Sequence, residues 1–256
     1  MFLWDKIAFG PIQSRRLGSS LGINVSPTQV KICSFDCIYC ECGWTLEKNI
    51  DSHLFFPVEE IVAAIETKLR QCKEAGTPIN SITFSGNGEP TLHPQFNQII
   101  DRLIVLRDTY YPETAITCLS NATQLANEKV FAALQKIENP VLKLDAATAS
   151  LFQIINKPIV PISSEEIIKQ LQQLNGNFIL QTLFFKGEID GQHFNNADES
   201  HLSLWIDVVK RLHPRKVMLY SLDRNTPAQA LEKIPQEKLQ EIVQRVRALG
   251  ISAAAY

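Results

Sequence analysis

The chain has 256 residues, of which 45% are hydrophobic and 20% are charged, and its formal net charge is −2. This length and apolar content suffice for one sizeable core, and the small net charge gives no general attraction to nucleic acid, although a local basic patch is compatible with it. No run of about 18 apolar residues occurs, which argues against a membrane span. The first residues lack a basic segment followed by a long apolar one, and the six cysteines are clustered unevenly, so we expect a cytoplasmic protein without a disulfide framework.

Strand-like and helix-like segments alternate along the chain. A short apolar stretch over 21–25 predicts the first strand. Over 57–75, apolar residues recur at spacings of three, four and seven, which indicates an amphipathic helix that ends at Gly76. The further predicted strands cover 81–84, 115–119, 141–144, 178–184 and 216–220. The further predicted helices cover about 96–107, 126–135, 164–174 and 200–212, with a last one that is capped by Gly250.

Six strands that alternate with helices imply parallel pairing with right-handed crossovers. We therefore predict an α/β fold, an open, partial (β/α)6 barrel of the TIM type with a parallel sheet and outer helices. A single domain over 1–256 is expected, with an N-terminal extension over about 1–18 and the core barrel over about 19–256. Ligands bind such sheets at the carboxyl ends of the strands, so residues that do chemistry should follow strands. Polar or glycine-bearing turns do follow the predicted strands, at 85–92, 120–122, 145–147, 185–187 and 221–224.

The loop after the first strand contains Cys33, Cys37 and Cys40, in the spacing CxxxCxxC. Three thiolates from one loop leave a [4Fe–4S] cluster one protein ligand short of the usual four, so that one iron can bind a small molecule. Two other interpretations are open. The last two cysteines could be a redox pair, or half of a zinc site completed by Cys33, Cys42 or a histidine. No second CxxC or HxxxH segment is present to complete such a zinc site.

The remaining cysteines and the histidines suggest no further ligands. Cys72 lies on the apolar stripe of its predicted helix, and Cys118 lies within a predicted strand, so both are expected in the core. Cys42 is interpreted as a bystander that could replace a ligand in a damaged cluster. The five histidines show no ligand-like spacing and are assigned no role.

The cysteine segment resembles the radical S-adenosylmethionine (SAM) enzymes, which also have an aromatic residue at the position of Tyr39. The segment Gly86-Asn87-Gly88-Glu89-Pro90 resembles the GGEP-like motif that holds the amino group of SAM in this superfamily. The resemblance implies that Glu89 supports that loop or balances the charge of the sulfonium. Taken without the resemblance, the segment is equally a turn before a helix that begins with proline.

Ser120 and Asn121 look like the polar turn that contacts the ribose or carboxylate of SAM in relatives, although they also form an ordinary helix N-cap pair. Lys143 and Asp145 alternate with leucines and share one face of a strand. Inside the barrel, such a pair would be functional or orienting; outside, it would be a solvated edge pair. Gln181 lies beside Thr182 in an apolar run, where a buried amide needs a partner. Lys143, Asp145 and Gln181 are therefore the candidate catalytic residues.

Charged residues near the two ends of the predicted sheet are candidate substrate contacts. Asp223 and Arg224 follow the sixth strand and could clamp a carboxylate or phosphate, although a structural salt bridge is commoner. Arg15 and Arg16 precede the first strand and could grip phosphates of an RNA or nucleotide. They could equally hold the open edge of the barrel by pairing with acidic side chains, which the acidic net charge favours.

A wider similarity points to a narrower iron–sulfur family of radical SAM proteins, which is distantly grouped with the tRNA wyosine-base synthases. The similar segments are 9–24, 37–44, 143–146, 181–184 and 221–227. The wyosine synthases have additional cysteines before the radical SAM motif for a second cluster. This chain has none before Cys33, which puts their pyruvate-adduct chemistry in doubt here.

The resemblance implies an enzyme that uses a [4Fe–4S] cluster to cleave SAM reductively into methionine and a 5′-deoxyadenosyl radical, which abstracts hydrogen from a substrate. A nucleotide or RNA base is one candidate substrate; a peptide, protein or small metabolite is the alternative. An external electron donor of the flavodoxin or ferredoxin type is implied, because no flavin fingerprint or second cluster motif is visible. A non-catalytic electron carrier is a different class, although ferredoxins normally bind their clusters through four cysteines.

Overall fold

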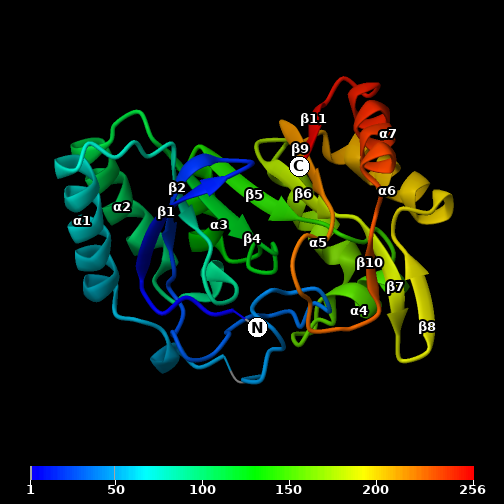
Figure 1. The fold of residues 1–256 in the computed structure, drawn as a ribbon, viewed down its shortest axis with the longest axis horizontal. Helices are drawn as coiled ribbons and strands as arrows, with labels where there is room; N and C mark the ends of the chain where they lie inside the picture. Colours follow the sequence, from blue (N-terminus) through cyan, green and yellow to red (C-terminus); the bar gives the residue numbers. More distant parts are fainter. Residues whose placement is uncertain (1, 49) are drawn as a thin grey trace.

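A computed structural model describes residues 2–48 and 50–256 (Figure 1). Within these residues, the main sheet has the strand order β1-β2-β3-β4-β5-β6-β9-β11. Its parallel strands are β2 (Gly18–Ile23), β3 (Ser81–Phe84), β4 (Ala115–Ser120), β5 (Asn139–Lys143), β6 (Ile179–Leu183), β9 (Lys216–Tyr220) and β11 (Ser252–Ala255). One edge strand, β1 (Ala8–Ser14), runs antiparallel to β2. The sheet does not close, so the predicted open barrel is confirmed.

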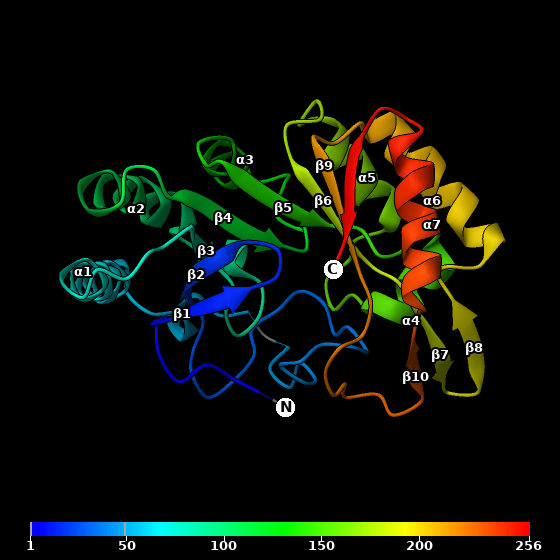
Figure 2. The ribbon, with the colours of Figure 1, turned by 45° about the horizontal axis from the view of Figure 1, so that its top comes forward.

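Helices cover the outer face of the curved sheet (Figures 1 and 2). They are α1 (Val58–Glu74), α2 (Phe96–Tyr110), α3 (Glu128–Gln135), α4 (Ala149–Asn156), α5 (Ser164–Gln172), α6 (Glu199–Leu212) and α7 (Gln236–Arg247). Side chains cap the start of several of them. Ser163 and Glu166 form a capping box on α5, and Asp198 accepts a hydrogen bond from the third residue of α6. Among the described residues, no helix is long and apolar enough to cross a membrane.

The two faces of the sheet differ in polarity. Residues such as Ile82, Phe84 and Cys118 belong to the large apolar core under the helices. Because side chains alternate along a strand, the intervening residues point into the barrel. Several of these are hydroxyl residues that hydrogen-bond one another. Ser20 bonds to Thr83 (2.8 Å) and Ser81 to Thr117 (2.7 Å) between neighbouring strands, and Ser81 bonds to Thr83 (2.9 Å) within β3. The interior of the barrel is therefore polar on the β2–β4 side.

The opposite side of the barrel interior is apolar. Val141, Ile179 and Met218 form a separate small cluster, against which Leu17 and Tyr256 pack. Leu17 belongs to the turn of the β1–β2 hairpin, so the hairpin at one edge of the sheet contacts strands near the other edge. The predicted N-terminal extension thus contains a strand whose turn reaches across the open side of the barrel.

Four features of the fold were not predicted, the first of which is the edge strand β1 described above. The helix α4 and the strand β11 were missed, and β6 is followed by a second, antiparallel sheet of β10 (Leu231–Lys233), β7 (Phe185–Ile189) and β8 (Gln192–Asn195). The predicted strand over 178–184 therefore corresponds to β6, and the polar turn expected after it is the start of β7. Cys72 and Cys118 are buried in the core, as predicted.

Candidate active site

The cysteine loop and the glycine-rich segment lie side by side at the carboxyl end of the sheet. An isolated parallel bridge joins Ile32 to Gly88. The amide of Ile32 donates to the carbonyl oxygen of Asn87 (3.0 Å), and the amide of Glu89 donates to that of Ile32 (2.9 Å). Two segments separated by about fifty residues are thus held together by backbone hydrogen bonds, next to the first cysteine.

Close packing explains the two glycines of this segment. Gly88 has a φ of +128°, and a Cβ there would lie 1.8 Å from the carbonyl oxygen of Ile32. A Cβ on Gly86 would lie 2.2 Å from Oδ1 of Asn24, at the end of β2. The sequence alone attributed these glycines to the approach of a ligand. The structure gives an independent reason for them, and their contact with SAM stays a prediction.

The polar side chains of the segment bind protein groups. Nδ2 of Asn87 donates to the carbonyl oxygens of Trp4 and Pro27 (both 2.9 Å), and its Oδ1 accepts from the amide of Trp4 (2.8 Å). Asn87 therefore ties the N-terminal segment to the glycine-rich loop. Its amide donates to Oδ1 of Asn24 (2.9 Å) and its carbonyl oxygen accepts from Ile32, so the polar groups of Asn87 bind protein and its contact with SAM stays a prediction.

Glu89 connects this segment to the loop after β4. One carboxylate oxygen accepts from the amide and hydroxyl of Thr91 (3.1 and 2.5 Å), and the other accepts from the amide of Asn121 (2.6 Å). Burial raises the pKa of Glu89, although these hydrogen bonds act in the opposite direction. Nδ2 of Asn121 in turn donates to Oγ of Ser34 (2.9 Å) and lies 3.6 Å from Sγ of Cys33. The cysteine loop, the glycine-rich segment and the turn at Ser120 and Asn121 thus form one network around the first cysteine. Ser120 contributes a hydrogen bond to Glu89.

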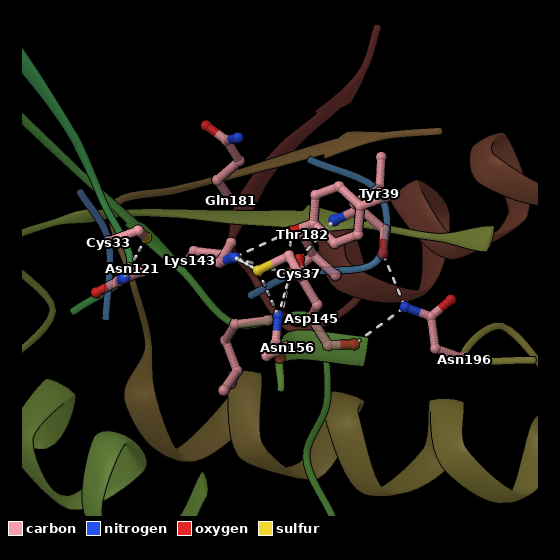
Figure 3. Close-up of polar contacts among 12 residues, drawn as sticks. Cys33, Cys37, Tyr39, Asn121, Lys143, Asp145, Asn156, Gln181, Thr182 and Asn196 are labelled. Atoms are coloured by element: carbon pink, nitrogen blue, oxygen red, sulfur yellow. Dashed lines mark hydrogen bonds and ion pairs between the residues drawn. The ribbon is translucent and has the colours of Figure 1, made fainter. Parts of the chain in front are cut away.

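Lys143 and Asp145 are buried together beside the second cysteine (Figure 3). Nζ of Lys143 donates to Sγ of Cys37 and to Oη of Tyr39, both at 3.0 Å, and it lies 3.5 Å from Oδ2 of Asp145. Tyr39 donates to the same carboxylate oxygen at 2.5 Å. Burial alone would lower the pKa of Lys143, but Cys37 and Asp145 raise it above its ordinary value. The pair is therefore an interior one, not a solvated edge pair, and Lys143 is a fixed positive charge next to Sγ of Cys37.

Two asparagines that the sequence did not indicate complete this group. Nδ2 of Asn156, the last residue of α4, donates to Oδ2 of Asp145 (3.0 Å) and lies 3.6 Å from Sγ of Cys37. Asn196 donates to the carbonyl oxygens of Asp145 (3.0 Å) and Leu183 (2.7 Å) and accepts from the amide of Phe185 (2.8 Å) (Figure 3). Each lies far along the chain from the residues it contacts, so spacing gave no sign of it.

A second buried lysine, also missed, lies next to the cysteines. Lys31 is 3% exposed and donates to the carbonyl oxygen of Gly43 at 2.9 Å. Burial lowers its pKa, but the neighbouring Cys40, Cys33 and Cys37 together raise it. A lysine between two apolar residues, two positions before the first cysteine, was the available signal in the sequence.

The cysteines differ in acidity. A hydrogen bond from Cys42 and the charge of Lys31 lower the pKa of Cys40 to about 5, against the effect of burial, whereas burial raises that of Cys33 to about 12. The hydrogen bond to Cys40 and, as a smaller effect, burial raise the pKa of Cys42, so Cys42 is a neutral thiol beside the thiolate of Cys40. In residues 2–48 and 50–256, no three His, Cys, Asp or Glu side chains are arranged around a single metal ion.

A cavity of about 470 Å³ opens from this site into the barrel. Its lining at the cysteine end includes Tyr39, Cys40, Cys42, Gly86 and Gly88. At the other end it reaches the β1–β2 hairpin and the end of β9, where Arg16 and Tyr220 line it.

The other predicted residues lie outside the lysine–cysteine group. Nε2 of Gln181 donates to Oη of Tyr220 at 2.8 Å, so Gln181 does not join Lys143 and Asp145, and Figure 3 shows its side chain apart from them. Arg15 pairs with Asp223 (2.8 Å) and Arg224 pairs with Glu41 (2.5 Å), each with both side chains largely exposed. For Arg15 and Arg224, the structure therefore shows the structural alternative given above, in which these arginines pair with acidic side chains. Their contact with a substrate stays a prediction.

Comparison with known proteins identifies the family. Residues 30–199 match the model of the radical SAM superfamily, so the chain belongs to that superfamily. Within it, the chain belongs with the UPF0026 proteins: it is 30% identical over 237 residues to the one from Helicobacter pylori, covering 91% of this chain and 71% of that protein. Membership implies SAM and an iron–sulfur cluster as cofactors in general, and the chain is a radical SAM enzyme.

Solved structures agree in fold. A radical SAM methyltransferase from Sphaerobacter thermophilus superposes with a TM-score of 0.65 at 18% identity, covering 93% of this chain and 65% of that one. Archaeal TYW1 superposes with a TM-score of 0.52 at 16% identity, covering 90% and 71%. The chain thus spans slightly less than two thirds of the methyltransferase.

Proposed function

We propose that this protein binds a [4Fe–4S] cluster through Cys33, Cys37 and Cys40 and uses it to cleave SAM reductively, which starts radical chemistry on a substrate. The observation that carries the proposal is the cysteine loop itself, which is packed against the glycine-rich segment and flanked by two buried lysines. Zinc would require side chains that converge on one ion. The sequence has no second CxxC or HxxxH segment to supply such side chains, which favours a cluster over zinc.

Cys33, Cys37 and Cys40 would hold the cluster, which would supply the one electron needed for reductive cleavage of SAM to methionine and a 5′-deoxyadenosyl radical. The protein's residues have other tasks. Lys31 and Lys143 balance the negative charge of the thiolates, and Tyr39 and Asp145 hold Lys143 in place. The loop at Gly86–Glu89, together with Ser120 and Asn121, is the proposed binding site for SAM. The cavity beyond Tyr39 excludes bulk water from the reacting atoms.

The reductant is proposed to be an external flavodoxin or ferredoxin. The substrate is proposed to be a nucleotide or RNA base, because of the family grouping, with a peptide, protein or small metabolite as the alternative. An electron carrier without catalysis is disfavoured because the three cysteines adjoin a cavity and a buried polar network, which electron transfer alone does not require.

Anaerobic reconstitution with iron and sulfide, followed by SAM and dithionite, tests the proposal. We expect an EPR signal that changes on addition of SAM, together with production of 5′-deoxyadenosine. A cluster that ignores SAM would support the carrier instead. Bound zinc with no iron would refute both.

A further inference from the structure

Arg16 is held inside the barrel by its neighbours. It lies in the turn of the β1–β2 hairpin, next to Leu17, which packs against the apolar cluster of Val141, Ile179 and Met218. The guanidinium carbon of Arg16 lies 5.0 Å from the centroid of the Tyr220 ring. A residue at the sheet edge thus places its charge over a residue of β9, in the wall of the cavity.

Two polar atoms beside Tyr220 are buried and have no partner in the described part of the chain. They are Nη1 of Arg16, a donor, and Oε1 of Gln181, an acceptor. Gln181 is 9% exposed, and its Nε2 already donates to Tyr220. Buried polar groups without partners are unfavourable and are rare in native proteins. Arg16 lies over the ring of Tyr220 and Gln181 binds its hydroxyl group. Of these three residues, Arg16 and Tyr220 line the cavity, so the free donor of Arg16 is the one that faces a ligand there.

Arg16 differs from the other arginines around the cavity. Arg15 and Arg224 pair with Asp223 and Glu41, whereas Arg16 makes no ion pair among residues 2–48 and 50–256. One uncompensated positive charge therefore remains inside the cavity. A guanidinium with free N–H groups is suited to a carboxylate or a phosphate.

The wall of the cavity contains several aromatic residues, with Tyr220 next to Arg16 and with Trp4 next to Asn87 of the glycine-rich segment. The Trp4 and Phe9 rings are stacked, with centroids 3.7 Å apart and planes at 13°, and Phe9 covers Gly22 so closely that a Cβ there would lie 2.0 Å from the ring. Both aromatic residues line the cavity, as do Tyr220 and Tyr256. Such a wall favours a planar or apolar body on the ligand.

We infer that the substrate is a small anion: a molecule with one carboxylate or phosphate bound by Arg16, and a planar or apolar body against the aromatic residues of the cavity wall. This inference rests on the proposed function, because the same cavity reaches Cys40 and the glycine-rich loop. It narrows the substrate from a long RNA or protein chain to a small molecule with a single charged group.

Binding of three probes of similar shape to the full-length protein tests the inference: benzoate, phenyl phosphate and the neutral benzamide, each followed by ligand-observed NMR. We expect at least one of the anions to bind about tenfold or more tightly than benzamide. Arg16→Gln should abolish this preference, and Arg16→Lys should retain part of it. Arg15→Gln, at the neighbouring ion-paired arginine, should leave the preference intact.

Three outcomes would overturn the inference. Neither anion binds better than benzamide, or Arg16→Gln keeps the preference for the anion. In the third, SAM alone displaces benzoate and Arg16→Gln no longer binds SAM, which would assign Arg16 to the cofactor. Thermal melting of each variant reports whether it is folded. The proposed function is read separately, from cluster content and 5′-deoxyadenosine formation by the wild type. A protein that cleaves SAM but has no anion preference refutes this inference alone, whereas one that prefers the anion through Arg16 but cleaves no SAM refutes the proposed function alone.

Discussion

The two ends of the cavity differ in how their charges and hydrogen bonds are satisfied. At the cysteine end, Lys143 contacts Cys37, Tyr39 and Asp145, and Lys31 contacts Gly43 beside Cys40. At the hairpin end, by contrast, a donor of Arg16 and an acceptor of Gln181 are buried without partners among the residues that the structure describes.

This difference separates a preformed scaffold from a recognition surface. The cysteine end presents thiolates whose surroundings are already fixed by buried bonds, as a site for a permanently bound cofactor requires. The hairpin end has hydrogen-bonding capacity that only a ligand or water can fulfil, as a site for an exchanging substrate requires. Each prediction below tests one part of this contrast.

The largest effect is expected from the cluster ligands. Cys37→Ala should abolish iron binding, because two thiolates from the loop do not retain a cluster that is already one ligand short. Cys72→Ala is the matched control, since Cys72 lies on the buried face of α1, outside the cysteine loop. Iron per chain and visible absorbance after anaerobic reconstitution are the measurements. Equal iron loss in the two variants would falsify the assignment of ligands.

Asn196 is expected to support the scaffold from a distance. Its replacement by alanine leaves the carbonyl oxygens of Asp145 and Leu183 and the amide of Phe185 without their present partner, in a buried site. We expect the free energy of unfolding to fall by about 3 kcal/mol. Urea unfolding of the metal-free protein measures it, with the exposed Asn177→Ala as control. A loss below about 1 kcal/mol would mean that Asn196 does not hold the end of β6 in place.

Lys31 is expected to tune the cluster. A buried positive charge stabilises the more negative, reduced form of a nearby cluster, so its removal should lower the reduction potential. For Lys31→Met we expect a decrease of about 60 mV, equivalent to a tenfold change for one electron. EPR-monitored redox titration of samples with equal iron content measures it. Lys31→Arg should restore most of the potential, and the exposed Lys129→Met should not change it. A potential unchanged by Lys31→Met would leave this lysine a purely structural role.

The sequence predicted those parts of the fold that depend on local pattern. The alternation of apolar segments gave the parallel strands β2 to β6 and β9, and placing polar turns after strands gave the correct edge of the sheet. β1 was missed because Gly10 and Pro11 interrupt its pattern. The β7–β8 hairpin has mostly exposed residues, although Asp190-Gly191 at its turn was a usable signal.

The site was predictable where its residues are close in sequence. The three cysteines and the segment Gly86–Pro90 are recognisable from their spacing in the sequence. Their contacts are not recognisable in this way, because Lys143 and Asn156 meet Cys37, and Asn196 meets Asp145, only in the folded protein. The sequence left the burial of Lys143 and Asp145 open, since alternation along a strand cannot tell which face lines the barrel.

His93, to which the sequence assigned no role, gives the scaffold a weak sensitivity to acid. It is buried just after the glycine-rich segment. Its Nε2 donates to the carbonyl oxygen of Phe56 (2.9 Å), and its Nδ1 accepts from the amide of Gln95 (3.1 Å). Protonation of Nδ1 would break the second bond. Burial lowers the pKa of His93, although the Phe56 carbonyl acts in the opposite direction.

The sign of the pH effect follows from that lowered pKa. The unfolded chain takes up a proton on His93 at a higher pH than the folded chain does, so the stabilisation is full above the unfolded pKa of about 6.5 and decreases as the pH falls below it. Between pH 8 and pH 5 we expect a loss of about 1 kcal/mol, the contribution of the Gln95 hydrogen bond. His93→Gln should reduce this slope, whereas the exposed His193→Gln on β8 should not. Anion binding by Arg16 should persist over the same range, because a guanidinium keeps its charge. An identical slope in wild type and His93→Gln would place the acid sensitivity elsewhere in the molecule.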